Sequence, residues 1–199
     1  MISFFFLTLV LEYSRMVNYT ITILDISCKG LTKLSDDIDK YNNLEILRCI
    51  ENQLTSLDNL PPKLEVLNCC VNKLNRLDNL PPTLKELYCD GNQITSLDNL
   101  HPNLIELYCG YNNITSLDNL PPTLKELRCN RNRLTSLDNL PSKLEVLFCN
   151  NNQITSLDNL PPTLKELNCV ENPLKYDFEP TLENIRNYNA SRMLASRNE

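Results

Sequence analysis

The chain has 199 residues, which is enough for one or two ordinary domains. It contains 25 Asp and Glu against 19 Lys and Arg, with a formal net charge of -6. This acidic balance argues against a nucleic acid or an anionic membrane surface as the partner. Pro is common (12 residues) and Gly is scarce (3 residues), so the turns must be built largely from Pro, Asn and Asp.

Residues 1–20 are expected to form an apolar N-terminal extension or cap. They hold an apolar run from Phe4 to Leu11, which is too short to span a bilayer. The run also lacks the basic and small flanking residues of a secretory signal peptide. We therefore expect no membrane span and disfavour secretion, although three Asn-x-Ser/Thr sequons leave secretion open. Either residues 1–15 form an apolar strand over the first repeat, or Met16 is the true start and they are a poorly structured extension.

A divergent first repeat is expected over residues 21–43. Its outer segment, SDDIDKYNN, offers Ser35 or Asp36 as a helix cap ahead of the apolar residues Ile38 and Tyr41. The segment therefore predicts one turn of helix. The expected inward positions of the repeat are Ile21, Leu24, Ile26 and Leu31.

Seven regular units follow over residues 44–172, each opening twenty residues after the one before it; six match the frame LxxLxCxxNx[LI]xxLxxL throughout, and the seventh matches its first nine positions. Self-similarity at a fixed period of this length is typical of a solenoid. In the unit LKELYCDGNQITSLDNLHPN, the third to fifth residues, Glu86 to Tyr88, are predicted to form a short strand with Leu87 turned inward. Stacked units would place these strands in one parallel sheet, about 4.8 Å apart. The opening residues are Leu44, Leu64, Leu84, Leu104, Leu124, Leu144 and Leu164.

Cys and Asn each recur at one fixed position of the unit. An Asn at each turn out of the sheet is expected to bond backbone groups that no strand ladder reaches. The cysteines are expected to be a buried file of reduced thiols, because residues stacked in one direction do not converge on a metal. Cys70 is either an ordinary exposed cysteine or a reactive thiol. The nine cysteines in this arrangement favour a reducing compartment and hence the cytoplasm. The repeated cysteines are Cys49, Cys69, Cys89, Cys109, Cys129, Cys149 and Cys169.

The outer half of each unit reads TSLDNLPPT with little change. It is too short for a helix, and its prolines fix an extended course. An Asp recurs along this wall, as in Asp98 and Asp118, where it serves either in turn capping or in a calcium-binding ridge. We favour turn capping, because Ca²⁺ requires six to eight oxygen ligands.

The C-terminal segment, residues 173–199, is expected to be a cap helix and tail. Pro173 breaks the repeat, and Pro180 precedes a predicted helix that begins near Thr181 with Leu182 and Ile185 on its inner side.

The repeated frame LxxLxCxxNxLxxLxxLPPx resembles the leucine-rich repeat in its shortest, twenty-residue class. It is similar to repeats of bacterial effector proteins, and the Cys-bearing variant LTSLDNLPPTLKEL is similar to repeats encoded by giant DNA viruses of amoebae. The resemblance implies an α/β-type solenoid: a curved right-handed superhelix with a concave parallel β-sheet, an extended polyproline-like convex side and a small helical C-terminal cap. It also implies a protein-binding role.

Positions that vary between units on the concave side are the candidates for binding. Aromatic residues and Arg are enriched at the energetic centres of protein interfaces. Alternatively, these side chains only satisfy one another, with Tyr88 on Tyr108 and Arg128 between Tyr108 and Phe148. The Glu residues beside them are expected to be a solvated face or to steer a basic partner. The predicted protein-binding residues are Arg48, Tyr88, Tyr108, Tyr111, Arg128, Arg131 and Phe148.

No enzymatic site is predicted. The single histidine, His101, stands where other units have Pro, and no Gly-rich phosphate loop is present. We expect no cofactor and no metal, and a monomeric protein-protein interaction module that binds a protein partner. The alternatives are a structural component of a particle or surface, and an adaptor for a host ubiquitin ligase. The 27 residues after Asn172 are too few for a ligase domain of its own.

Overall fold

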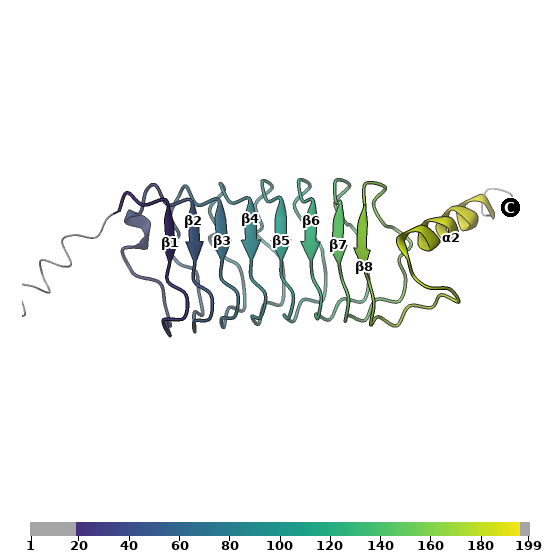
Figure 1. Cartoon of the computed structure of the whole chain (residues 1–199), viewed down its shortest axis with the longest axis horizontal. Helices are drawn as coiled ribbons and strands as arrows, with labels where there is room; N and C mark the ends of the chain where they lie inside the picture. The colour runs from purple at the N-terminus through teal and green to yellow at the C-terminus, as the bar shows by residue number, and fades with distance from the viewer. Residues whose placement is uncertain (1–18, 196–199) are drawn as a thin grey trace, which may run out of the picture.

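The computed structural model describes residues 19–195, which form one row of parallel strands closed by a C-terminal helix (Figure 1). The predicted N-terminal strand or extension falls on residues 1–18 and lies outside the described residues. Eight strands pair in sequence order, each in parallel register with the next, so the predicted stack of units is confirmed. The strands are β1 (Ile23–Asp25), β2 (Ile46–Arg48), β3 (Val66–Asn68), β4 (Glu86–Tyr88), β5 (Glu106–Tyr108), β6 (Glu126–Arg128), β7 (Val146–Phe148) and β8 (Glu166–Asn168).

The core is built from the same positions of every unit. In the fourth strand Leu87 and the following Cys89 have no exposed surface, whereas the intervening Tyr88 is only partly buried. This alternation arises because successive side chains of a strand point to opposite faces. Ile94 and Leu97, in the outer half of the unit, close the core from the other side. One continuous apolar core therefore runs the length of the solenoid.

A ladder of buried asparagines joins consecutive units. The side chain of Asn92 donates to the carbonyls of Cys69 and Cys89 at 3.1 and 3.0 Å, and it accepts the N–H of Leu74 at 3.0 Å. These backbone groups lie where the chain leaves the sheet and have no ladder partner there. The predicted role of the Asn file is therefore confirmed.

The outer halves of the regular units contain no helix or strand within residues 49–165, as the prolines predict. The carboxylate of Asp98 accepts the Ser96 hydroxyl of its own turn at 2.8 Å and the Asn119 side-chain amide of the next unit at 3.3 Å. Asn119 itself adopts a left-handed backbone with φ of 64°, which Asn tolerates better than most residues. The Asp98 carboxylate thus bonds side chains of its own turn and of the next unit, and it links adjacent turns.

At the N-terminal end, the predicted turn of helix is the short 3₁₀ helix η1 (Ile38–Lys40). Ile38 is buried against the core, as expected. The predicted caps Ser35 and Asp36 do not hold the N-cap position, which is occupied by Asp37 without a side-chain cap bond. The hydroxyl of Ser35 instead accepts the N–H of Asp37 at 3.3 Å.

The C-terminal cap is the helix α2 (Leu182–Ala195), which begins one residue after the predicted Thr181. The hydroxyl of Thr181 accepts the N–H of Asn184 at 3.2 Å, and Ile185 is fully buried against the last unit. Arg186 donates to the carbonyls of Pro162 and Leu164 at 3.1 and 2.6 Å. Where a regular unit has Thr at this place, as at Thr83 and Thr163, its hydroxyl bonds the equivalent carbonyls. The helix therefore supplies bonds that a further unit of this kind would have made.

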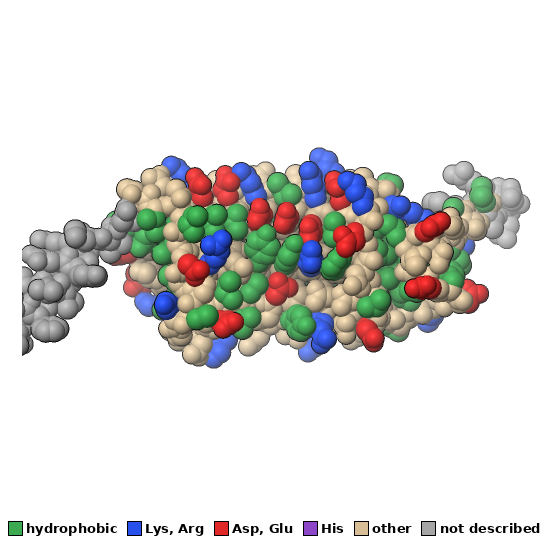
Figure 2. Space-filling view, in the orientation of Figure 1, with side chains coloured by type: hydrophobic (Ala, Val, Ile, Leu, Met, Phe, Trp, Pro, Cys, Tyr) green, Lys and Arg blue, Asp and Glu red, His purple; other side chains and the backbone are tan. Residues whose placement is uncertain are grey.

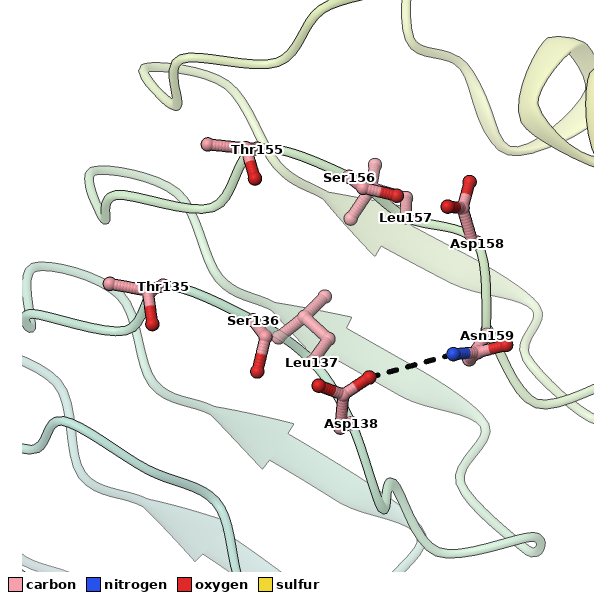
Figure 3. Close-up of a pocket in the computed structure, with 9 residues that line it drawn as sticks. All are labelled: Thr135, Ser136, Leu137, Asp138, Thr155, Ser156, Leu157, Asp158 and Asn159. Carbon is pink, nitrogen blue, oxygen red and sulfur yellow. Dashed lines mark hydrogen bonds between the residues drawn. The ribbon is translucent and has the colours of Figure 1, made fainter.

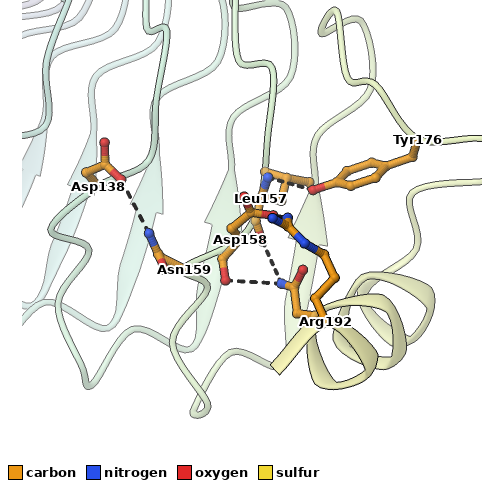
Figure 4. Close-up of polar contacts among 7 residues, drawn as sticks. Asp138, Leu157, Asp158, Asn159, Tyr176 and Arg192 are labelled. Atoms are coloured by element: carbon orange, nitrogen blue, oxygen red, sulfur yellow. Dashed lines mark hydrogen bonds and ion pairs between the residues drawn. The ribbon is translucent and has the colours of Figure 1, made fainter. Parts of the chain in front are cut away.

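Polar contacts also fix the C-terminal cap, including the segment before α2, to the outer wall (Figure 4). The hydroxyl of Tyr176 accepts the N–H of Leu157 at 2.7 Å, and Arg192 lies 3.3 Å from the carboxylate of Asp158. Over residues 19–195, no helix combines the length and the apolar character needed to cross a bilayer.

Candidate functional site

We define the sheet face as the solvent-facing side chains of β2 to β8 and of the turns that directly follow them. Figure 2 shows acidic side chains gathered in a row over the middle strands, beside hydrophobic and basic side chains. The central residues of the strands are buried, so only the two flanking residues of each strand reach this face.

The consecutive strands β4, β5, β6 and β7 each contribute one large side chain to a continuous stack. The rings of Tyr88 and Tyr108, which are paired in register, meet edge to face with centroids 4.8 Å apart. The guanidinium of Arg128 lies 4.6 Å from the ring of Tyr108 and 4.4 Å from the ring of Phe148. The predicted mutual contacts are therefore confirmed, and we call these four residues the aromatic stack.

Carboxylates hold the aromatic stack in place. The hydroxyl of Tyr108 and the Nε of Arg128 both donate to Oε1 of Glu126, at 2.6 and 2.7 Å. The hydroxyl of Tyr88 donates to Glu86 at 2.9 Å and to Glu106 at 3.3 Å. Burial and the Glu126 carboxylate raise the pKa of Tyr108 to about 12, so its hydroxyl remains a donor at neutral pH. The residue pattern alone does not indicate that these Glu side chains anchor the stack.

The other predicted binding residues lie outside the stack. Arg48 is on β2, and Asn68 of β3 separates it from Tyr88. Tyr111 and Arg131 form a separate pair, with the guanidinium 4.9 Å from the ring centroid. Both adopt a left-handed backbone with φ of 53°, which turns them out of the strand direction, and Tyr111 is 55% exposed.

A row of three in-register glutamates, Glu86, Glu106 and Glu126, runs beside the stack. Like charges placed directly opposite each other on neighbouring strands are destabilising. Glu126 is compensated by Arg128, whereas within residues 19–195 neither Glu86 nor Glu106 has an ion-pair partner. Partial burial raises the pKa of Glu106, and the two flanking carboxylates raise it further.

We expect the substitution Glu106→Gln to stabilise the fold at neutral pH, by about 0.5 kcal/mol. A carboxyl whose pKa is raised by folding binds its proton more readily in the folded state, so its ionisation destabilises that state. Gln removes the charge and keeps an acceptor for the Tyr88 hydroxyl. The gain should be measured by thermal unfolding at pH 7 and should vanish near pH 3, where the wild-type carboxyl is neutral. A melting temperature below that of the wild type at pH 7 would refute this account of the row.

Next to the stack, a small network surrounds Gly110. Its N–H donates to Asp90 at 2.7 Å, and a Cβ at this position would lie 2.7 Å from Asp90 Oδ1 and 2.8 Å from Asn130 Oδ1. Cys70 lies on the other side of Asp90, with its thiol 3.6 Å from Oδ2. Burial, followed by the charge of Asp90, raises the pKa of Cys70 to about 12. The structure therefore favours an ordinary cysteine over a reactive thiol.

The remaining thiols give a simple prediction. All nine cysteines are free, seven are buried, Cys28 is exposed and Cys70 is half-buried. Burial raises the pKa of Cys49 to about 12 and raises the pKa of the other stacked thiols as well. Ellman's reagent at pH 8 should therefore modify at most two thiols rapidly in the folded chain and all nine in denaturant. Rapid reaction of more than two thiols in the folded chain would contradict the buried file.

A pocket of about 190 Å³ lies on the outer wall between the units that open at Leu124 and Leu144 (Figure 3). Its polar groups mainly serve the wall: Asn159 donates to Asp138 at 3.5 Å, and Asp158 pairs with Arg192. No group of three or more His, Cys, Asp or Glu within residues 19–195 is arranged to hold a metal ion. The sheet face is therefore the better candidate site.

Comparisons with known proteins agree with this architecture. A family model described as "Leucine Rich repeats (2 copies)" matches residues 82–122 and 122–162. No curated protein matches the chain. Among solved structures, YopM from Yersinia enterocolitica is 30% identical with a TM-score of 0.72 over 82% of this chain, which spans only 41% of YopM.

Two further solved structures are similar. A Shigella effector leucine-rich repeat domain is 30% identical with a TM-score of 0.68, over 88% of this chain and 76% of that domain. The InlJ functional domain from Listeria monocytogenes, described as including a cysteine ladder, is 31% identical with a TM-score of 0.59, over 79% of this chain and 41% of that one. The twenty-residue period, the parallel ladder of strands and these likenesses agree, and the chain belongs to the leucine-rich repeat family.

Proposed function

We propose that the chain is a non-enzymatic protein-protein interaction module that binds a protein partner on its sheet face. The binding centre is the aromatic stack of Tyr88, Tyr108, Arg128 and Phe148, with the Tyr111 and Arg131 pair beside it. The observation that carries the proposal is the stack itself: Arg128 lies within 4.6 Å of two rings on neighbouring strands, at the middle of the sheet.

The composition of the stack supports this assignment. Tyr and Arg are over-represented among the residues that dominate binding energy, and these residues cluster at the centre of an interface. The neighbouring contacts and the Glu126 carboxylate already restrict the rotamers of Tyr108 and Arg128. Because less conformational entropy is lost on binding, such a preorganised surface gains affinity.

We further propose a monomer in a reducing compartment, such as the cytoplasm. All nine thiols are free, and the seven buried thiols follow one another from unit to unit. An oxidising compartment would instead favour disulfide formation by exposed cysteines such as Cys28.

The test is the double substitution Tyr108→Ala and Arg128→Ala. A partner recovered with the wild-type chain by proximity labelling, then purified, should bind the double variant about 100-fold more weakly in calorimetry. The control is Asn168→Ala, at the same strand position on β8 but outside the stack, which should bind as the wild type does.

The double variant should remain folded. The three lost ring and cation contacts contribute about 1 kcal/mol each to stability, so its melting temperature should fall by roughly 6 to 12 °C and the chain should stay folded at 25 °C. Wild-type affinity in a folded double variant would refute the assignment of the stack.

A further inference from the structure

We infer that the partner places a cationic side chain, a Lys ammonium or an Arg guanidinium, on the carboxylates of Glu86 and Glu106. This inference rests on the proposed function and specifies the chemistry of the segment that docks on the sheet face. The occupant to which it commits is a basic segment of a partner protein.

The first argument is the position of uncompensated charge. Glu86 and Glu106 are paired in register on β4 and β5, so their side chains leave neighbouring strands on the same face. In the described part of the chain neither carboxylate has an ion-pair partner, and two of the basic residues near them serve other carboxylates: Lys85 pairs with Glu65 at 2.7 Å, and Arg128 pairs with Glu126. Two carboxylates at this spacing without a cation between them are electrostatically unfavourable, and an added cation would relieve the repulsion.

The second argument is the coincidence of this charge with the aromatic stack. At the same strand position the neighbouring units carry apolar residues, namely Ile46, Val66 and Val146. The glutamates next to the stack therefore occur only on the three middle strands, where Tyr88, Tyr108 and Arg128 follow them. Only β8 repeats the glutamate, as the exposed Glu166, and there it has no aromatic neighbour in its own strand.

The third argument is geometry. The Tyr88 hydroxyl shares its one proton between the two carboxylates, whose oxygens lie 2.9 and 3.3 Å away, and their other lone pairs stay free. A cation seated on the two carboxylates would lie near the Tyr88 hydroxyl that bonds them. The positive charge of Arg128 excludes a second cation from the β6 and β7 end of the stack. The basic residue of the partner is thus directed to β4 and β5.

A half-buried carboxylate adds to the negative field of this region. Asp90 follows β4, accepts the N–H of Gly110 and has no ion-pair partner in the part of the chain that the structure describes. Complementary charge mainly increases the association rate and the specificity of a protein complex. The inferred docking should therefore weaken as the ionic strength rises.

The test uses short random peptides displayed on phage and selected on the immobilised full chain. The selected peptides should share a Lys or Arg at one position. Replacing that residue with Gln, or changing both Glu86→Gln and Glu106→Gln in the chain, should weaken binding about tenfold or more. The matched control is Glu166→Gln, the same position on β8, which should leave binding unchanged. The double Gln variant should melt no lower than the wild type, so a loss of binding would not reflect unfolding.

The affinity of the same peptides for the Tyr108→Ala variant is then measured. Peptides that lose affinity for Tyr108→Ala but not for the double Gln variant would overturn the inferred cation and leave the sheet-face function standing. Peptides that bind both variants as tightly as the wild type, or the recovery of no binding peptide, would count against both. Peptides that lose affinity for both variants and share a basic residue would support both.

Discussion

Replacing Asn152 with Ala should lower the free energy of unfolding by about 3 kcal/mol, measured by urea denaturation. Asn152 is only 8% exposed, and its amide donates to the carbonyls of Cys129 and Cys149, each at 3.0 Å. Its side-chain oxygen accepts the N–H of Leu134 at 3.0 Å. Alanine would leave all three backbone groups without these partners, and each buried unsatisfied group costs about 1 kcal/mol or more.

The matched control is Asn150→Ala, two residues earlier in the same turn. Its side chain lies on the sheet face and is only partly buried, so the substitution should change stability by about 0.5 kcal/mol at most. Equal effects of the two substitutions would show that the ladder does not join the units as its hydrogen bonds indicate.

Replacing Leu107 with Ala should destabilise the chain by about 3 to 4 kcal/mol. Leu107 has no exposed surface and lies between the equivalent Leu87 and Leu127 of the flanking strands, so the lost methyl groups leave a cavity in the middle of the core. Each unit contacts only its neighbours, so a defect at the centre separates the two halves of the array.

The control for this cavity is Val170→Ala, which removes an apolar side chain that is 57% exposed. Its cost should stay within about 0.5 kcal/mol. Urea-induced unfolding followed by circular dichroism measures both substitutions. A loss of under 1 kcal/mol for Leu107→Ala would mean that the leucine file is not the core that the structure places there.

The repeat allowed most of the fold to be predicted, because one rule applied to one unit fixes all of them. Once Glu86 to Tyr88 were assigned to a strand with Leu87 inward, the twenty-residue period set the whole sheet and the register of its strands. The Asn ladder was predictable for the same reason, since a buried amide at a fixed turn must bond its neighbours. The first unit was harder to predict, because its outer segment does not follow the period. The predicted caps were Ser35 and Asp36, whereas Asp37 holds the N-cap position.

The candidate site was only partly predictable. The contacts of Tyr88, Tyr108, Arg128 and Phe148 follow from their shared strand position, since parallel units place equivalent residues side by side. Arg48 has the same strand position, and Asn68 on the intervening strand separates it from the stack. The register shows which side chains are neighbours, but it does not show which of their atoms bond to one another.

The anchoring role of the glutamates could not be predicted either. Charged residues on the exposed face of a strand are usually solvated. Here the Glu carboxylates are oriented by hydrogen bonds from the Tyr88 and Tyr108 hydroxyls, which depend on side-chain rotamers. The left-handed backbone at Tyr111 and Arg131 could not be predicted either. The residues at the same turn of the other units do not indicate that a side chain projects from the sheet there.

Site-specific photo-crosslinking to the partner tests the central proposal most directly. The photoreactive residue p-benzoylphenylalanine would replace Phe148 on the sheet face in one variant and Thr155, exposed on the outer wall, in another. We predict a covalent adduct with the partner from position 148 and none from position 155. An adduct from position 155 alone would contradict a binding site centred on the aromatic stack.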